Sequence, residues 1–92
     1  MENNIILSAL SMDLKRVALG LYRKSYPTAN RFSQEAMKRK NEIDTHSLRQ
    51  YMQKIIEQID GVLAQKNQEQ KAEDALMMST LIQNYVVHNK QN

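Results

Sequence analysis

The stretch NRFSQEAMKRKNEIDTH, residues 30–46, holds most of the side chains in this chain that suggest chemistry. Phe32 lies among cations, a Lys-Arg-Lys run occupies 38–40, and His46 follows Arg39 by seven positions. Such residues suggest either a nucleic-acid interface or proton transfer on RNA. Successive helical residues point about 100° apart, so the three cations of the run spread around the axis and form no single patch. The run is therefore best interpreted as a helix C-terminus, where positive charge is favourable.

A second set of basic residues has better spacing for an electrostatic surface. Its helical pairs are seven residues apart, so each pair lies on one face of its helix. If the first two predicted helices are neighbours, the set forms one basic side, which predicts weak, salt-sensitive binding of nucleic-acid phosphates. Asp13 and Glu35 reduce the charge of this side, and Phe32 is assigned to the core, so no exposed aromatic is expected for base stacking. The set is Arg16, Arg23, Lys24, Arg31 and Lys38.

The spacing of Arg39 and His46 also resembles the Arg-x(4–6)-His pattern of the HEPN ribonuclease superfamily, whose members are helical bundles and often dimers. The resemblance implies a metal-independent ribonuclease with these two residues at its centre. However, Asp44-Thr45 predicts a new helix start between them, which separates the pair. The ribonuclease is therefore the least favoured interpretation. No catalytic residue, metal site or cofactor is predicted, since no Gly-rich phosphate loop or clustered His ligands are present.

Apolar residues outside the main helical stripes are the remaining functional signal. Met12 and Leu19 are seven apart and lie off the main seam beside Tyr22, while Met77 and Leu81 fall outside the main face of the last helix. Such residues either widen a core face or form a surface for another protein, where Met and Tyr are enriched. The second interpretation is preferred. It predicts a small non-enzymatic interaction or assembly module that pairs with itself as a homodimer, or with another protein.

Four amphipathic helices are predicted to position these residues. Apolar spacing places them at about 4–24, 27–43, 45–63 and 70–88, followed by a frayed tail at 89–92. Pro27 separates the first two helices because proline is disfavoured inside a helix but accepted in its first turn. Short connections favour antiparallel neighbours. The prediction is an all-α, single-domain, antiparallel (up-down-up-down) four-helix bundle spanning residues 1–92.

Composition limits the remaining possibilities. A chain of 92 residues fills one core, and 2 Gly with 1 Pro provide too few turns for an all-β fold. The absence of Cys excludes disulfides and thiolate chemistry and fits a cytoplasmic location. The net charge of +3 is mild, although residues 1–43 contain eight Lys/Arg against four Asp/Glu. No apolar run approaches the roughly 20 residues of a membrane span, so no membrane association is predicted.

Overall fold

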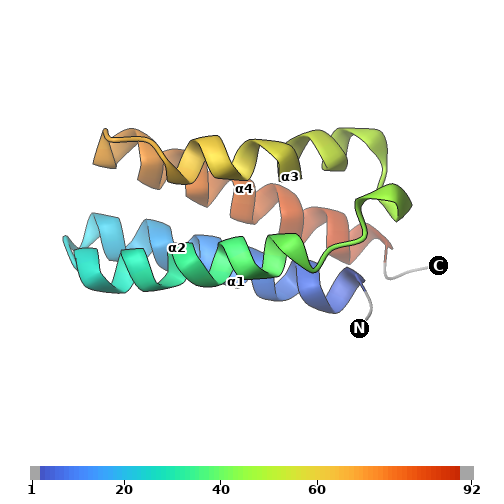
Figure 1. The fold of residues 1–92 in the computed structure, drawn as a ribbon, viewed down its shortest axis with the longest axis horizontal. Coiled ribbons are helices and arrows are strands. Elements are labelled where there is room, and N and C mark those ends of the chain that lie inside the picture. Colours follow the sequence, from blue (N-terminus) through green and yellow to red (C-terminus); the bar gives the residue numbers. More distant parts are fainter. Residues whose placement is uncertain (1–2, 90–92) are drawn as a thin grey trace.

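The computed structural model describes residues 3–89, which form four α-helices and one 3₁₀ turn. The helices are α1 (Asn3–Tyr22), α2 (Tyr26–Asn41), α3 (Gln50–Leu63) and α4 (Gln68–Asn89), and the 3₁₀ turn η1 (Thr45–Ser47) precedes α3. They alternate in direction, as Figure 1 shows, so the predicted all-α four-helix fold is confirmed. Asn89 ends α4, and the remainder of the predicted tail lies outside the described residues.

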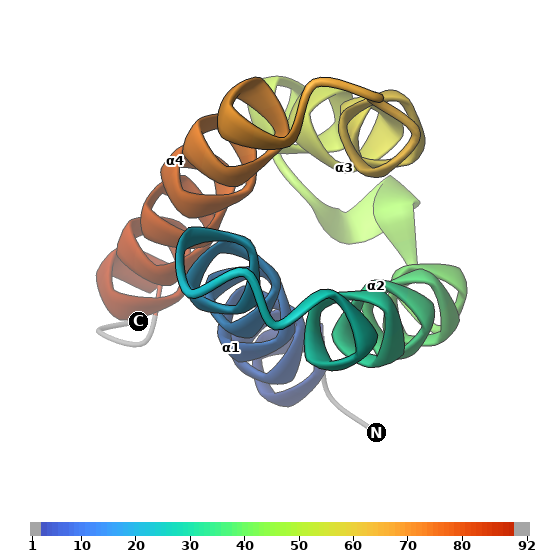
Figure 2. The same ribbon diagram turned by 90° about the vertical axis from the view of Figure 1, so that its left-hand side faces the viewer.

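The central element of the bundle is α1, which packs extensively on both α2 and α4. α3 completes the ring, packing on α4 and more sparsely on α2 (Figure 2). The apolar residues that recur at helical intervals along α1 form its core-facing stripe, since the large ones are buried. The largest fully buried side chains are Leu7, Leu10, Leu14, Val17, Met52, Ile56, Ile59, Ile82 and Val86.

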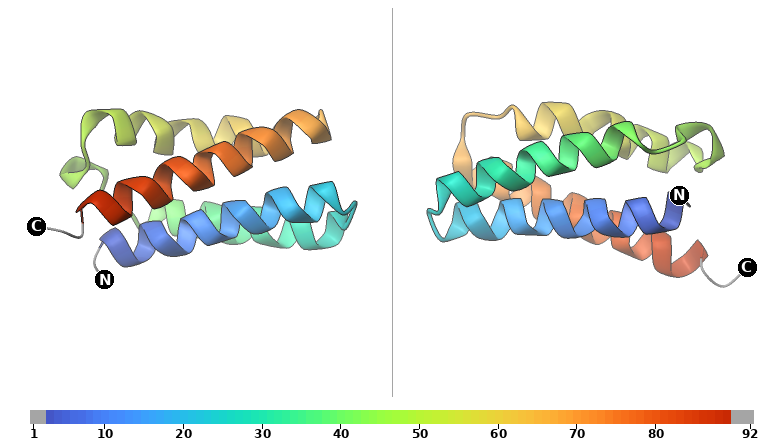
Figure 3. Two further views of the ribbon diagram at one scale, coloured as in Figure 1. Left: turned by 180° about the vertical axis from the view of Figure 1, so that it is seen from behind. Right: turned by 60° about the horizontal axis from the view of Figure 1, so that its bottom comes forward.

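Two buried serines join α1 to α4 where these helices pack together. The Ser11 hydroxyl donates to the Ser79 carbonyl at 2.9 Å, and the Ser79 hydroxyl donates to the Ser11 carbonyl at 2.8 Å. Small side chains allow close approach of the two backbones, and the reciprocal bonds satisfy both hydroxyls in a dry environment. Figure 3 shows α4 running obliquely across α1, so this contact fixes how far each helix extends past the other.

The α1–α2 turn is tight and depends on the conformation of its backbone. The N–H of Ser25 donates to the Gly20 carbonyl at 2.7 Å, and the N–H of Lys24 donates to the Leu21 carbonyl at 3.1 Å. These two bonds form a Schellman motif, which places Lys24 in the left-handed region at φ 59°. A Cβ at Gly20 would lie only 3.1 Å from the backbone nitrogen of Ala29, so this glycine permits α2 to pack closely.

The connection between α2 and α3 differs from its prediction. The expected helix at 45–63 is interrupted, because Leu48 and Arg49 are extended and α3 begins at Gln50. The extended segment buries Leu48 in the core and turns the chain back toward α2. Asp44 acts as a cap, but only of η1, by accepting from the His46 N–H at 3.2 Å. The Asn3 side chain holds this connection, donating to the Asp44 carbonyl at 2.9 Å and accepting from its N–H at 3.1 Å.

Candidate functional site

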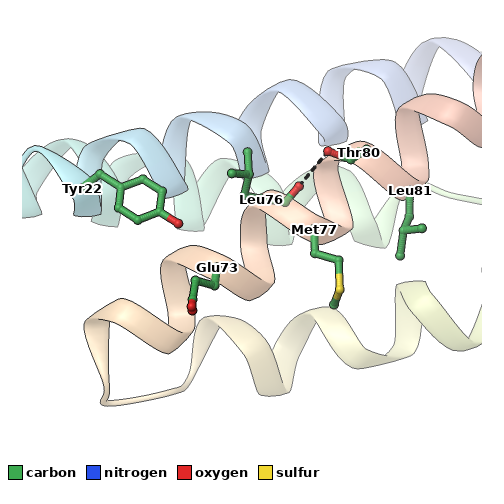
Figure 4. Close-up of a pocket in the computed structure, with 6 residues that line it drawn as sticks. All are labelled: Tyr22, Glu73, Leu76, Met77, Thr80 and Leu81. Carbon is green, nitrogen blue, oxygen red and sulfur yellow. Dashed lines mark hydrogen bonds between the residues drawn. The ribbon is translucent and has the colours of Figure 1, made fainter.

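A groove follows the seam between α1 and α4. One depression of about 400 Å³ is lined by Tyr22 of α1 and, on α4, by Glu73, Leu76, Met77, Thr80 and Leu81 (Figure 4). A second depression, of about 440 Å³, is lined by Met12 and Lys15 of α1 and by Leu76, Thr80, Gln83 and Asn84 of α4, with the Ser11 and Ser79 pair beneath. Both depressions include Leu76 and Thr80, so they form one continuous surface. We call this surface the α1–α4 groove.

Large apolar side chains in the α1–α4 groove are exposed to water. Met77 is 54% exposed, Tyr22 51%, Met12 44% and Leu81 40%. Figure 4 shows Tyr22 and Leu76 on the α1 side of α4, with Met77 and Leu81 extending to its other side. The predicted interaction residues Met12, Tyr22, Met77 and Leu81 thus lie outside the core and line one surface, which continues from the α1–α4 seam over the outward face of α4. The depression beside Tyr22 is mainly apolar, whereas the other is lined mostly by polar residues. An exposed apolar patch with a polar rim is typical of an interaction site.

The fifth predicted interaction residue, Leu19, belongs to a different part of the surface. It is 37% exposed, and it lines a hollow of about 270 Å³ between α1 and α2. We call this the α1–α2 hollow. Its other lining residues are Arg16, Gly20 and Arg23 of α1, Ser25 of the turn, and Thr28 and Phe32 of α2.

The basic residues predicted for nucleic-acid binding are only partly brought together. Arg16 and Arg23 both line the α1–α2 hollow. The guanidinium carbons of Arg16 and Arg31 lie 5.2 and 5.6 Å from the centroid of the Phe32 ring, which links the three residues. Phe32 packs against the buried core cluster, as predicted, but it is only half-buried and two arginines lie against its ring. The other two predicted residues are Lys24 in the turn and Lys38 on α2. Both are exposed, and neither lines the hollow.

Exposed aromatics are present, contrary to the sequence-based expectation. Tyr22, Tyr26 and Tyr51 are 51%, 41% and 55% exposed. The helical spacing of Tyr51 with Leu48 and Ile55 predicts a core position, and its exposure corrects that prediction. Because α3 begins at Gln50, Tyr51 lies in its first turn, where its ring packs edge-on against Tyr85 with centroids 5.8 Å apart. Helical spacing alone could not reveal this, since it depends on where the helix starts.

The structure gives Arg39 and His46 separate environments. The Arg39 Nε donates to Asp13 Oδ2 at 2.7 Å, joining α2 to α1. Burial raises the pKa of Asp13, and the hydrogen bond and charge of Arg39 oppose that rise only in part. His46 is exposed on η1. Within residues 3–89, no hydrogen bond or ion pair joins Arg39 to His46, so the geometry adds nothing to the ribonuclease interpretation.

Neither a metal-binding cluster nor a membrane-spanning helix is found in the described part of the chain. No three His, Asp or Glu side chains within residues 3–89 lie close enough together to hold a metal ion. No helix in the same range is both long and apolar enough to cross a membrane.

Comparison with known protein families, with curated proteins and with solved structures finds no match to this chain, so its function is inferred from geometry and chemistry alone.

Proposed function

We propose that this protein is a non-enzymatic helical assembly module that pairs with a second copy of itself through the α1–α4 groove. The observation that carries the proposal is the continuity of the groove. Its two depressions share Leu76 and Thr80, and exposed Met12, Tyr22 and Met77 extend along it. Transferring these side chains from water into an interface contributes about 25 cal/mol for each Å² of apolar surface buried. Flexible methionine side chains adapt to such a partner surface.

The charges of the groove favour a second copy as its occupant. Glu73 lies in one depression and Lys15 in the other, and neither makes an ion pair within the described chain. A two-fold axis through the shared Leu76 and Thr80 brings each depression of one copy onto the opposite depression of the second copy. Lys15 of each copy then meets Glu73 of the other. A single surface that carries both partners of a contact is self-complementary, as an isologous dimer requires.

In this proposal the groove is the centre of a larger contact between the two copies. A specific interface buries at least about 1,000 Å² in total, or about 500 Å² on each copy. That is less than a tenth of the 5967 Å² that the protein exposes. From Met12 to Tyr22, the groove follows α1 for about 15 Å at the usual helical rise of about 1.5 Å per residue. The absence of Cys fits the cytoplasm proposed for this module, since disulfides are rare in that reducing compartment.

Sedimentation of two matched variants tests the proposal. Met77→Glu places a charge in the groove, and Tyr26→Glu makes a comparable change at an exposed residue of α2 that does not line it. We expect wild type and Tyr26→Glu to sediment as dimers at tens of micromolar. Met77→Glu should be monomeric, with dimer affinity reduced about tenfold or more, because burying an unpaired carboxylate is costly. A monomeric wild type, or a dimer that is indifferent to Met77→Glu, contradicts the proposal.

A further inference from the structure

The α1–α2 hollow is chemically unlike the α1–α4 groove and lies where a different helix meets α1. Its volume of about 270 Å³ is below the range of roughly 300–1,000 Å³ that holds drug-sized ligands. Its walls include two guanidinium groups and two hydroxyl groups, and no acidic residue lines it. A site of this size and charge fits a small anionic group better than a large apolar ligand.

Of the two arginines that line the hollow, Arg16 packs on the Phe32 ring, and Arg31 of α2 packs on the same ring from outside the lining. Stacking engages the face of a guanidinium and leaves its N–H groups available to hydrogen-bond an oxyanion in its plane. Neither residue makes an ion pair within residues 3–89, and the same holds for Arg23. The lining of the hollow therefore carries positive charge without an acidic residue, and the charge of Asp13 acts on Arg16 without a direct ion pair.

The acidic residue nearest to Arg16 along the chain is already occupied. Asp13 is three residues earlier on α1, but its carboxylate accepts from Arg39 Nε at 2.7 Å. The side-chain hydroxyls of Ser25 and Thr28 make no hydrogen bond within the described chain. Ser25 precedes α2 without capping it, so its hydroxyl remains available as a donor. An oxyanion with several acceptor oxygens would thus meet charged and neutral donors together.

From these features we propose that the α1–α2 hollow binds a phosphate group through Arg16 and Arg23, with the Ser25 and Thr28 hydroxyls as additional donors. Arginine forms bidentate, charge-assisted hydrogen bonds to two oxygens of a phosphate, so these arginines should prefer phosphate to a halide ion. The same chemistry is offered by a phosphomonoester and by the backbone of a single-stranded nucleic acid. This site is independent of self-association, because none of its lining residues lines the α1–α4 groove.

Inorganic phosphate is the first probe, and its binding is measured by the amide chemical shifts of the full chain. Saturable shifts should centre on Arg16, Gly20 and Arg23. The Arg16→Gln/Arg23→Gln variant should weaken binding at least tenfold, whereas Arg49→Gln, an exposed arginine before α3, should change it less than twofold. Unchanged melting temperatures would show that the variants remain folded. Shifts that do not saturate, or an equal loss in Arg49→Gln, overturn the proposal, because either result means that only overall charge matters.

Two further probes distinguish the sources of the phosphate. An oligonucleotide without terminal phosphates supplies only diesters, and a nucleoside 5′-monophosphate supplies a monoester. If the site takes a strand, log K for the oligonucleotide falls with log salt, and Arg16→Gln/Arg23→Gln lowers that slope by about 1.4, at about 0.7 per phosphate contact. If it takes a monoester, only the mononucleotide depends on these two arginines. The site is contradicted if binding of neither probe depends on these two arginines.

Discussion

Replacement of Ser33 by alanine should make the protein more stable. The Ser33 Oγ is shielded from water and has no hydrogen-bond partner within the described residues, although it lies in α2. A buried polar group without a partner costs about 1–3 kcal/mol. Alanine also has the highest helix propensity, which adds a few tenths of a kcal/mol. We therefore expect Ser33→Ala to raise the free energy of unfolding by at least about 1 kcal/mol, or about 4–8 °C in melting temperature for each kcal/mol.

Ser11→Ala is the matched control, because it removes a buried hydroxyl that is fully satisfied. This change deletes the 2.9 Å bond to the Ser79 carbonyl but keeps the bond that the Ser79 hydroxyl donates back. The free energy of unfolding should fall by about 0.5–1.5 kcal/mol. Urea unfolding followed by far-UV circular dichroism, at one fixed protein concentration, measures both variants. A Ser33→Ala variant that is less stable than wild type would refute the assignment of an unsatisfied hydroxyl.

Three further predictions concern the backbone and one buried charge. Gly61→Ala should stabilise the protein by about 0.5–1 kcal/mol, because Gly61 is exposed and nothing lies within 4 Å of an added Cβ. Gly20→Ala should destabilise it by about 1–3 kcal/mol, because the added Cβ would meet the backbone of α2. Urea midpoints in the reverse order contradict this packing. Lys24→Gly should raise the melting temperature, since glycine relieves a left-handed residue by about 1 kcal/mol, and a decrease would argue against the φ of 59°. Asp13→Asn should gain stability relative to wild type as pH rises. Burial raises the pKa of Asp13 despite Arg39, so the folded state holds this proton more tightly and wild type loses stability as pH rises through the folded pKa. The opposite trend in unfolding experiments across that range would mean that the ion pair outweighs burial.

The helices and their core faces were predictable because local spacing determines them. Leu7, Leu10, Leu14 and Val17 recur at helical intervals, and all four are fully buried. The break before α3 was not predictable in this way. Leu48 fits the apolar stripe of a continuous helix, yet it reaches the core from an extended backbone. Periodicity identifies which side chains are buried, but it does not distinguish the two backbone conformations that bury this one.

The contacts that surface residues make with a neighbouring helix were the least predictable feature of the fold. Met12 and Leu19 lie on one line along α1, but Met12 lines the α1–α4 groove and Leu19 lines the α1–α2 hollow. The oblique crossing of α4 explains the difference, since the neighbour of that line changes along α1 (Figure 3). The Asp13–Arg39 pair likewise requires the relative register of α1 and α2, which no spacing within one helix contains.

The most direct test of self-pairing through the α1–α4 groove is a charge-reversal series measured by sedimentation equilibrium. Lys15→Glu alone and Glu73→Lys alone each place like charges together across the proposed two-fold axis, so both should weaken the dimer. The double variant restores both contacts and should recover a mass of twice the 10.7 kDa chain. A double variant as weak as the sum of the single changes, or a wild type that stays at the monomer mass, would contradict self-pairing in this register.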